Sequence, residues 1–139
     1  MNGYLITAGI LNSIAAALHI GCIIFGATWY RFFGAGENMA TLAEQGSSKP
    51  TIITAGIVLI LSIWALYAFS AAGLIGKLPL IRLALVLITT ISFLRGIAGF
   101  FLITNPGENT PTFWFWSSAI CLLFAATHLI GLKQQWGAL

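Results

Sequence analysis

Three charged or imidazole side chains lie well inside the apolar stretches of this sequence: His19, Arg95 and His128. Arginine can pair with an anion or stabilise negative charge that develops in a reaction, and histidine can exchange a proton or bind a metal. A metal site would need several His, Cys or carboxylate ligands at suitable spacing. The apolar stretches contain no Asp or Glu, so we expect no metal site.

Haem ligation by the two histidines is the most attractive cofactor hypothesis, but their depths argue against it. On membrane-spanning helices with a rise of 1.5 Å per residue, His19 and His128 would differ in depth by about 15 Å. The axial ligands of one iron approach it from opposite faces. The sequence therefore predicts no haem and no other bound cofactor.

The composition identifies the elements that must position these residues. Of the 139 residues, 59% are hydrophobic and 6% are charged, whereas soluble domains have roughly 45–50% apolar and about 25% charged residues. A water-soluble fold is therefore excluded. The six basic residues are scattered singly, which excludes nucleic acid as a partner because no patch could neutralise several phosphates.

Four segments are long and apolar enough to cross a bilayer as helices, which takes roughly 20 residues each. We expect one all-α domain over residues 1–139, a four-helix transmembrane bundle. No alternation of apolar and polar residues typical of barrel strands is present, and Pro50 and Pro111 suit first turns of helices, with Thr110 as a cap. The predicted spans are about 4–29, 51–72, 80–103 and 112–132, with a short amphipathic segment at 37–46 in an outer loop.

Orientation follows from the basic residues on each side of the membrane. Lys77, Arg82 and Lys133 share a side with the amino terminus, whereas Arg31 and Lys49 lie on the other. The excess of basic residues on the side of the amino terminus predicts that both termini are cytoplasmic. We expect an integral, multi-pass protein of a bacterial cytoplasmic (inner) membrane.

Stripes of small and polar residues should face one another inside the bundle, and depth then sorts the polar side chains into two groups. Arg95 and His19 would both lie about 20 Å above the inner boundary. An outer-half group could bind a ligand, and an inner-half polar cluster would lie below it. The outer group contains Arg95, His19, Glu37, Ser92 and Ser117, and the inner cluster contains Asn12, Tyr67 and His128.

Arg95 can be interpreted in two ways. An arginine at mid-bilayer costs roughly 2.5–3.5 kcal/mol on insertion scales, so the bundle must supply partners, and we expect Glu37, Ser92, Ser117 or helix-end carbonyls to do so. Glu37 follows two glycines that would let its loop fold back over the bundle. The arginine is then either a structural link between loop and bundle or the cation of a pocket for an anionic or polar ligand.

Known small membrane families give no assignment. Small multidrug exporters use a first-span carboxylate that is absent here, and vitamin K epoxide reductase-like proteins need cysteine pairs that are also absent. The fluoride channels' opening motif has no match. Four spans and the pair Arg95-Gly96 are loosely similar to DoxX-like membrane proteins, a similarity too unspecific to assign membership.

The sequence favours a non-enzymatic membrane protein. Through the outer Arg/His pocket it would bind a lipid, a small polar or anionic ligand, or a membrane partner protein, and would act as an accessory or transport component. A small dimeric channel or transporter is one alternative. The other is a membrane-embedded enzyme acting on a lipid or quinone, with His19 as acid or base and Arg95 stabilising negative charge. The expected partners are membrane lipids and a second copy or another membrane protein.

Overall fold

The computed structural model describes residues 2–33, 37–105 and 111–139. These residues form helices and connecting turns, with no strand among them. Four helices are long and apolar enough to span a membrane, which confirms the predicted helical, multi-pass class. The elements are α1 (Gly3–Phe25), α2 (Ala27–Phe32), α3 (Glu37–Glu44), α4 (Lys49–Ala72), α5 (Ile81–Phe101), α6 (Pro111–Gln135) and the 3-10 turn η1 (Trp136–Ala138).

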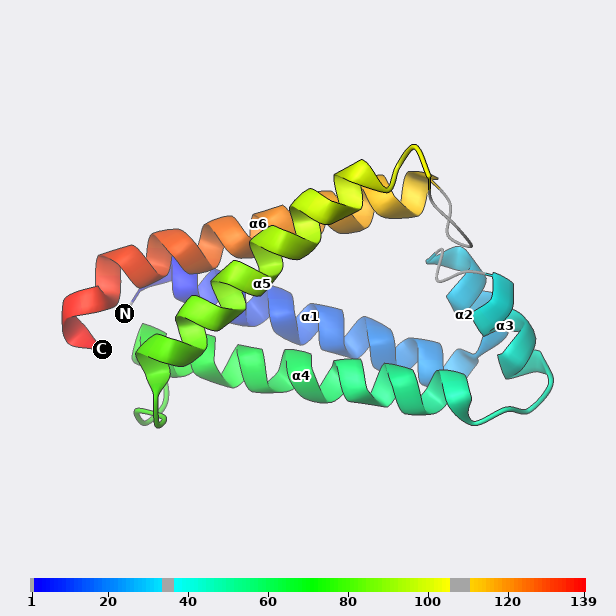
Figure 1. Cartoon of the computed structure of the whole chain (residues 1–139). Helices are drawn as coiled ribbons and strands as arrows, with labels where there is room; N and C mark the ends of the chain where they lie inside the picture. Colours follow the sequence, from blue (N-terminus) through cyan, green and yellow to red (C-terminus); the bar gives the residue numbers. More distant parts are fainter. Residues whose placement is uncertain (1, 34–36, 106–110) are drawn as a thin grey trace.

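The long helices form two closely packed pairs, α1 with α4 and α5 with α6. Figure 1 shows the pairs meeting where both chain termini lie and diverging toward the opposite end of the molecule. We call these the terminal end and the open end. Contact between the pairs runs mainly through α1 and α6, so the terminal end fixes how the pairs are joined.

A compact apolar core holds the terminal end together, built from α1, α4, α5 and α6. Asn2 adds polar links there: its side chain accepts the Leu5 amide as a helix cap and donates to Gln134 at 2.7 Å, and its own amide donates to the Ala72 carbonyl. One capping residue thereby connects the ends of three helices. The buried core residues are Leu5, Ala71, Ala72, Ile81, Leu85, Ile88 and Leu132.

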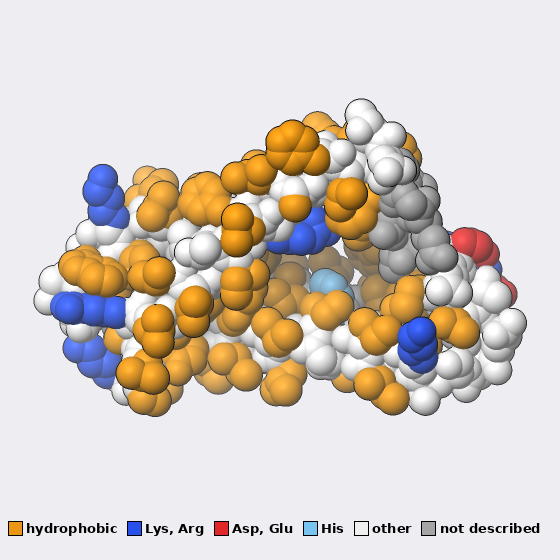
Figure 2. Space-filling view, in the orientation of Figure 1, with side chains coloured by type: hydrophobic (Ala, Val, Ile, Leu, Met, Phe, Trp, Pro, Cys, Tyr) orange, Lys and Arg blue, Asp and Glu red, His pale blue; other side chains and the backbone are white. Residues whose placement is uncertain are grey.

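The outer surface of the spans is apolar, as Figure 2 shows by its many hydrophobic side chains. Less than two-fifths of the most apolar window of each span is buried inside the protein. In water so much exposed apolar area would drive aggregation. In a bilayer these side chains are solvated by acyl chains.

The first span is shorter than predicted. Gly26 has a φ of 73°, and its amide caps α1 by donating to the Cys22 carbonyl. A positive φ interrupts a right-handed helix and is readily adopted by glycine. Residues 27–29, which the sequence assigns to the first span, therefore begin the separate helix α2.

The other boundaries lie within three residues of the expected ones. Pro50 lies in the first turn of α4 and Pro111 begins α6, as predicted; the proposed cap Thr110 lies outside the described residues.

The turn between α4 and α5 is tight. Gly73, with a φ of 89°, ends α4, and the Ser70 hydroxyl donates to Gly76 and accepts the Leu78 amide.

At the open end, α3 is the predicted amphipathic helix, and its apolar side packs on the protein. Cys22, Tyr30 and Ala40 form a small buried cluster there, against which Met39 and Ala43 also pack. The Tyr30 hydroxyl lies 2.9 Å from the Thr54 hydroxyl and links α2 to α4. The segment thus covers one end of the α1/α4 pair.

Candidate functional site

Arg95 lies on α5, and side chains of the paired helix α6 hold it in place. Its Nη2 donates to the Ser117 hydroxyl at 3.1 Å, and its guanidinium carbon lies 4.8 Å from the centroid of the Trp114 ring. Trp114 and Ser117 lie on one face of α6 because they are three residues apart. The predicted contact between Arg95 and Ser117 is confirmed, and the guanidinium is oriented by a hydrogen bond and a cation–π contact.

Gly99 makes room for this guanidinium. It lies four residues after Arg95 on the same face of α5, and a Cβ at this position would meet Arg95 Nη1 and the Ser118 hydroxyl. Both of those polar atoms are buried and lack a hydrogen-bond partner among the described residues. The arginine therefore keeps unused donor capacity next to a close helix–helix contact.

The expectation that Glu37 pairs with Arg95 is wrong. Glu37 accepts hydrogen bonds from Arg31 instead, with Nη2 and Oε1 2.7 Å apart, and Glu44 binds the same guanidinium. Hydrogen bonds from Arg31 lower the pKa of both carboxyl groups. The same hydrogen bonds raise the pKa of the Arg31 guanidinium. Arg31 is only six residues before Glu37, so the short connection favours it over a residue on a distant helix.

Ser92 is buried on α5, three residues before Arg95. Among the described residues no hydrogen bond joins the two side chains. Arg95 likewise has no carboxylate partner there, and Glu108 lies outside the described residues. Within the described part of the chain, the positive charge is therefore compensated only by a hydroxyl and an aromatic ring.

His19 lies on α1 and is half-buried. Its Nδ1 lies 2.6 Å from the Ala15 carbonyl oxygen. A carbonyl can only accept, so Nδ1 donates, and in the neutral ring Nε2 then carries a lone pair. Nε2 has no hydrogen-bond partner among the described residues, which leaves an acceptor available on this helix.

A hollow separates the two helix pairs toward the open end. Figure 2 shows a Lys or Arg side chain on one of its walls, a His side chain at its floor and hydrophobic side chains around it. Arg95 on α5 and His19 on α1 are both half-buried, whereas His128 is fully buried. Among the described residues no hydrogen bond joins Arg95 and His19. The α1 and α5 backbones make no extensive contact across the hollow.

Two of the three residues that the sequence analysis groups in the inner-half cluster, Asn12 and His128, are in contact. Asn12 Nδ2 lies 3.2 Å from His128 Nε2, and both side chains are fully buried between α1 and α6. His128 Nδ1 lies 2.7 Å from the Phe124 carbonyl and must donate to it, so Nε2 accepts from the asparagine. The histidine is therefore a fully engaged packing element.

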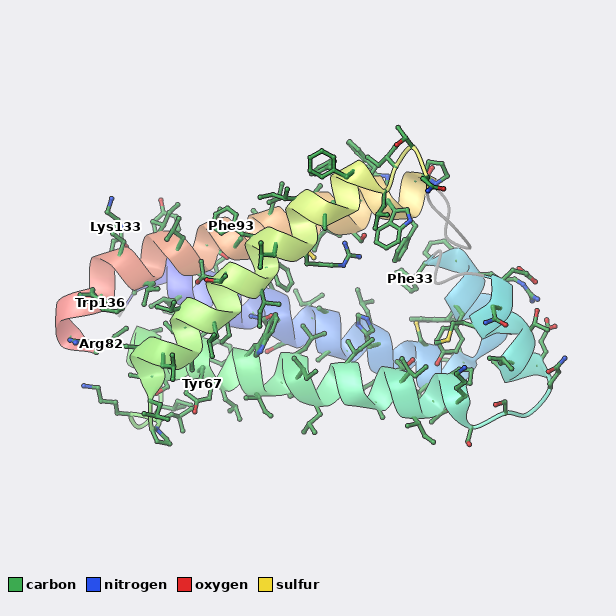
Figure 3. The ribbon with its side chains drawn as sticks, viewed as in Figure 1. Phe33, Tyr67, Arg82, Phe93, Lys133 and Trp136 are labelled. Atoms are coloured by element: carbon green, nitrogen blue, oxygen red, sulfur yellow. The ribbon has the colours of Figure 1, made fainter. Side chains whose placement is uncertain are left out.

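Tyr67 does not belong to that cluster, contrary to expectation. Its hydroxyl donates to the Pro79 carbonyl at 3.0 Å, and Figure 3 shows it beside the turn that follows α4. Depth alone placed it with Asn12, but its position around the helix axis directs it toward the turn. Tyr67 therefore stabilises the α4–α5 connection.

Sequence reasoning missed two residues of the site. Trp114 lies against the guanidinium, and its spacing of three residues from Ser117 could have indicated this. The second residue is Gly99, which lies next to the guanidinium. The described residues contain no group of three or more His, Cys, Asp or Glu side chains able to hold a metal ion.

No family model, curated protein or solved structure matches this chain.

Proposed function

We propose that this chain is a non-enzymatic membrane protein that binds an amphiphile with an anionic group in the hollow between the α1/α4 and α5/α6 pairs. Arg95 would supply the countercharge, and the protein would act as an accessory or transport component. The observation that carries the proposal is an intramembrane guanidinium with no carboxylate partner among the described residues. Its two described contacts, Ser117 and Trp114, are both uncharged.

Charge compensation favours an anion in this hollow. A buried cation is expensive unless it is paired, and the Ser117 hydroxyl satisfies only one of the five N–H donors of arginine. A carboxylate or phosphate could accept two parallel hydrogen bonds from the guanidinium. The hydrogen bond to Ser117 and the contact with Trp114 hold the guanidinium on α6 before a ligand arrives, which reduces the ordering cost of binding.

The surroundings of Arg95 favour an amphiphile over a small inorganic ion. Hydrophobic side chains surround the hollow, and the helices that flank it are largely apolar on their exposed faces. An acyl or prenyl tail would bury its surface against them at roughly 25 cal/mol per Å² relative to water. A ligand carrying both an anionic group and such a tail matches the hollow and its cation.

Binding of a labelled lipid to the purified full chain in neutral detergent tests the proposal. We expect an anionic phospholipid to bind at least tenfold more tightly than phosphatidylcholine. Arg95→Gln should reduce this preference to near one, and Arg95→Lys should retain part of it because the charge remains without the planar fork. Lys133→Gln is the charge-matched control, since Lys133 is exposed near the terminal end and points away from the bundle (Figure 3).

A folded Arg95→Gln protein that keeps the wild-type preference would overturn the proposal. Folding is checked by size-exclusion chromatography and circular dichroism. If Arg95→Gln does not fold, Ser117→Ala replaces it, because this change removes only the hydroxyl that orients the guanidinium and should weaken anionic lipid binding severalfold.

For the topology, we propose that the terminal end faces the cytoplasm of a bacterial inner membrane. Lys77, Arg82 and Lys133 lie at that end, and cytoplasmic loops carry an excess of such residues. The hollow would then lie in the outer half of the bilayer. Alkaline phosphatase fused after Leu139 should be inactive, and the same enzyme inserted near Ser47 should be active; the reverse pattern would contradict this orientation.

A further inference from the structure

We infer that the α5/α6 pair swings against the α1/α4 pair about the terminal end, so that the open end widens and narrows while each pair keeps its shape. The inference goes beyond the proposed function, because it concerns a motion of the fold that does not require a ligand. Three features carry it: the course of the chain between the pairs, the contacts within each pair and the position of the contacts between them.

The chain passes from one pair to the other once, through residues 73–80. Helices α1 and α4 are joined through α2 and α3, which pack on that same pair, and α5 is followed directly by α6. Figure 1 shows the turn between α4 and α5 at the terminal end. Each connection at the open end therefore belongs to a single pair, so a change in the distance between the pairs stretches no backbone there.

The α1/α4 pair is held together toward both of its ends. Toward the terminal end, a Cβ at Gly9 of α1 would meet the ring of Phe69 on α4, so the two helices approach closely. At the open end, the Tyr30 hydroxyl of α2 binds the Thr54 hydroxyl of α4 at 2.9 Å. Contacts at both ends keep these two helices from separating.

The α5/α6 pair is also held together where it is farthest from the other pair. A Cβ at Gly99 of α5 would meet the Ser118 hydroxyl of α6, and small residues of this kind allow the close contact that stabilises helix pairs in membranes. The rings of Phe100 and Phe115 lie edge to face with their centroids 6.0 Å apart. This pair therefore moves as one unit.

The contacts between the two pairs lie toward the terminal end. Leu5 of α1 packs on Gly131 of α6, where a Cβ would meet the leucine side chain. Farther along α1, Asn12 is bonded to His128 of α6. Between residues that the structure describes, no hydrogen bond or ion pair joins the pairs closer to the open end than this one. The Asn12–His128 contact is therefore the natural pivot.

A small rotation about this pivot has a large effect at the open end. Helix α1 continues from Asn12 to Phe25, a rise of about 20 Å at 1.5 Å per residue. A rotation of about 10°, a size known from rigid-body transitions of other proteins, would move the far end by about 3 Å. In a bilayer the separating faces are solvated by acyl chains in either position, so little hydrophobic free energy opposes the movement.

Distances between two spin labels on the full chain in phosphatidylcholine nanodiscs test the inference. Cys22→Ala/Cys121→Ala removes both native thiols. In this background, labels at Ile24→Cys on α1 and Phe101→Cys on α5 measure the separation of the pairs at the open end, and both positions are exposed. We expect the width of their distance distribution to be at least twice that of every control pair.

The controls are one label pair within each helix pair and one that spans the two helix pairs at the terminal end. All of their positions are exposed, so the motion of the label itself is comparable, and additional width across the open end reports the swing. The control pairs are Ile24→Cys/Ile52→Cys, Phe101→Cys/Trp116→Cys and Tyr4→Cys/Leu83→Cys.

A distribution across the open end as narrow as in the controls would overturn the inference. Equally broad distributions within the helix pairs would overturn it too, because the pairs would then not move as units. If Phe101→Cys prevents folding, the exposed positions Ile20 on α1 and Leu94 on α5 take the labels instead.

The outcomes also separate this inference from the proposed function. An anionic phospholipid bound by Arg95 should narrow the distribution across the open end, and Arg95→Gln should abolish the narrowing but leave the broad distribution. A broad distribution with no response to this lipid supports the swing and counts against the proposed lipid site. Lipid binding that depends on Arg95, together with a narrow distribution before and after the lipid is added, supports the site and rejects the swing.

Discussion

Asn12 of α1 and His128 of α6 are joined by a hydrogen bond of 3.2 Å in the fully buried contact between the two helix pairs. No charged group takes part in this contact, and each residue is also bonded to its own helix, through the Ala8 and Phe124 carbonyls. The pair therefore holds α1 against α6 in one register.

Replacement of both partners should destabilise the protein by less than the sum of the two single replacements. Asn12→Leu leaves His128 Nε2 without its donor, and we expect the free energy of unfolding to fall by about 1–2 kcal/mol. In the double variant Asn12→Leu/His128→Leu, the loss should be smaller than the sum of the two single losses by about 0.6 kcal/mol, as for other interhelical hydrogen bonds in membranes. Unfolding by denaturing detergent in mixed micelles measures all four proteins. Strictly additive losses would contradict the coupling.

Gly99→Ala should separate α5 from α6. The new methyl group would meet the Ser118 hydroxyl and Arg95 Nη1, and overpacking typically costs about 1–3 kcal/mol. Gly56→Ala is the control within α4, because nothing lies within 4 Å of its Cβ position, and it should leave the melting temperature unchanged or raise it. Ser118→Gly should rescue part of the Gly99→Ala loss; a wild-type melting temperature for Gly99→Ala alone would contradict the close approach.

The carboxyl-terminal turn should be released by Arg82→Ala. Arg82 donates to the Trp136 carbonyl at 3.0 Å and lies over its ring, and Lys77 donates to the Ala138 carbonyl at 3.1 Å. Figure 3 shows Arg82 and Trp136 next to each other at the terminal end. Removal of the guanidinium should increase the rate at which carboxypeptidase releases the last residues severalfold. The same rate in Arg82→Ala and in the exposed-lysine control Lys133→Ala would reject this role.

Acid should loosen α3 from the open end. Hydrogen bonds from Arg31 lower the pKa of Glu37 and Glu44, so their contribution is complete above the ordinary carboxyl pKa and is lost as the pH falls through the lowered values. Hydrogen exchange of the α3 amides, corrected for the intrinsic pH dependence, should therefore accelerate at acidic pH. Glu37→Gln/Glu44→Gln should show the faster exchange already at neutral pH. Exchange that does not depend on the carboxylates would indicate that the apolar contacts of Ala40 alone hold this helix.

Hydropathy predicts the spans well because insertion depends on segment length and apolar content, both of which are local. Polar contacts were predictable only where depth and helix face agreed, as for Asn12 with His128 and for Arg95 with Ser117. Tyr67 has the right depth but a different helix face, and Glu37 has a nearer partner in Arg31. The divergence of the helix pairs could not be predicted, because periodicity defines which face is buried but not the angle between two faces.

Because the helix pairs diverge, the molecule has a wedge-like outline that is wider at the open end than at the terminal end. Two separated pairs of helices occupy more membrane area than four helices packed side by side. The protein would displace more lipid from the leaflet around its open end than from the other leaflet. A protein that occupies more area in one leaflet than in the other is sensitive to membrane curvature. We expect it to reconstitute more densely into small vesicles than into large ones, with the open end on their convex side, and equal density in both would show that lipids fill the difference in area.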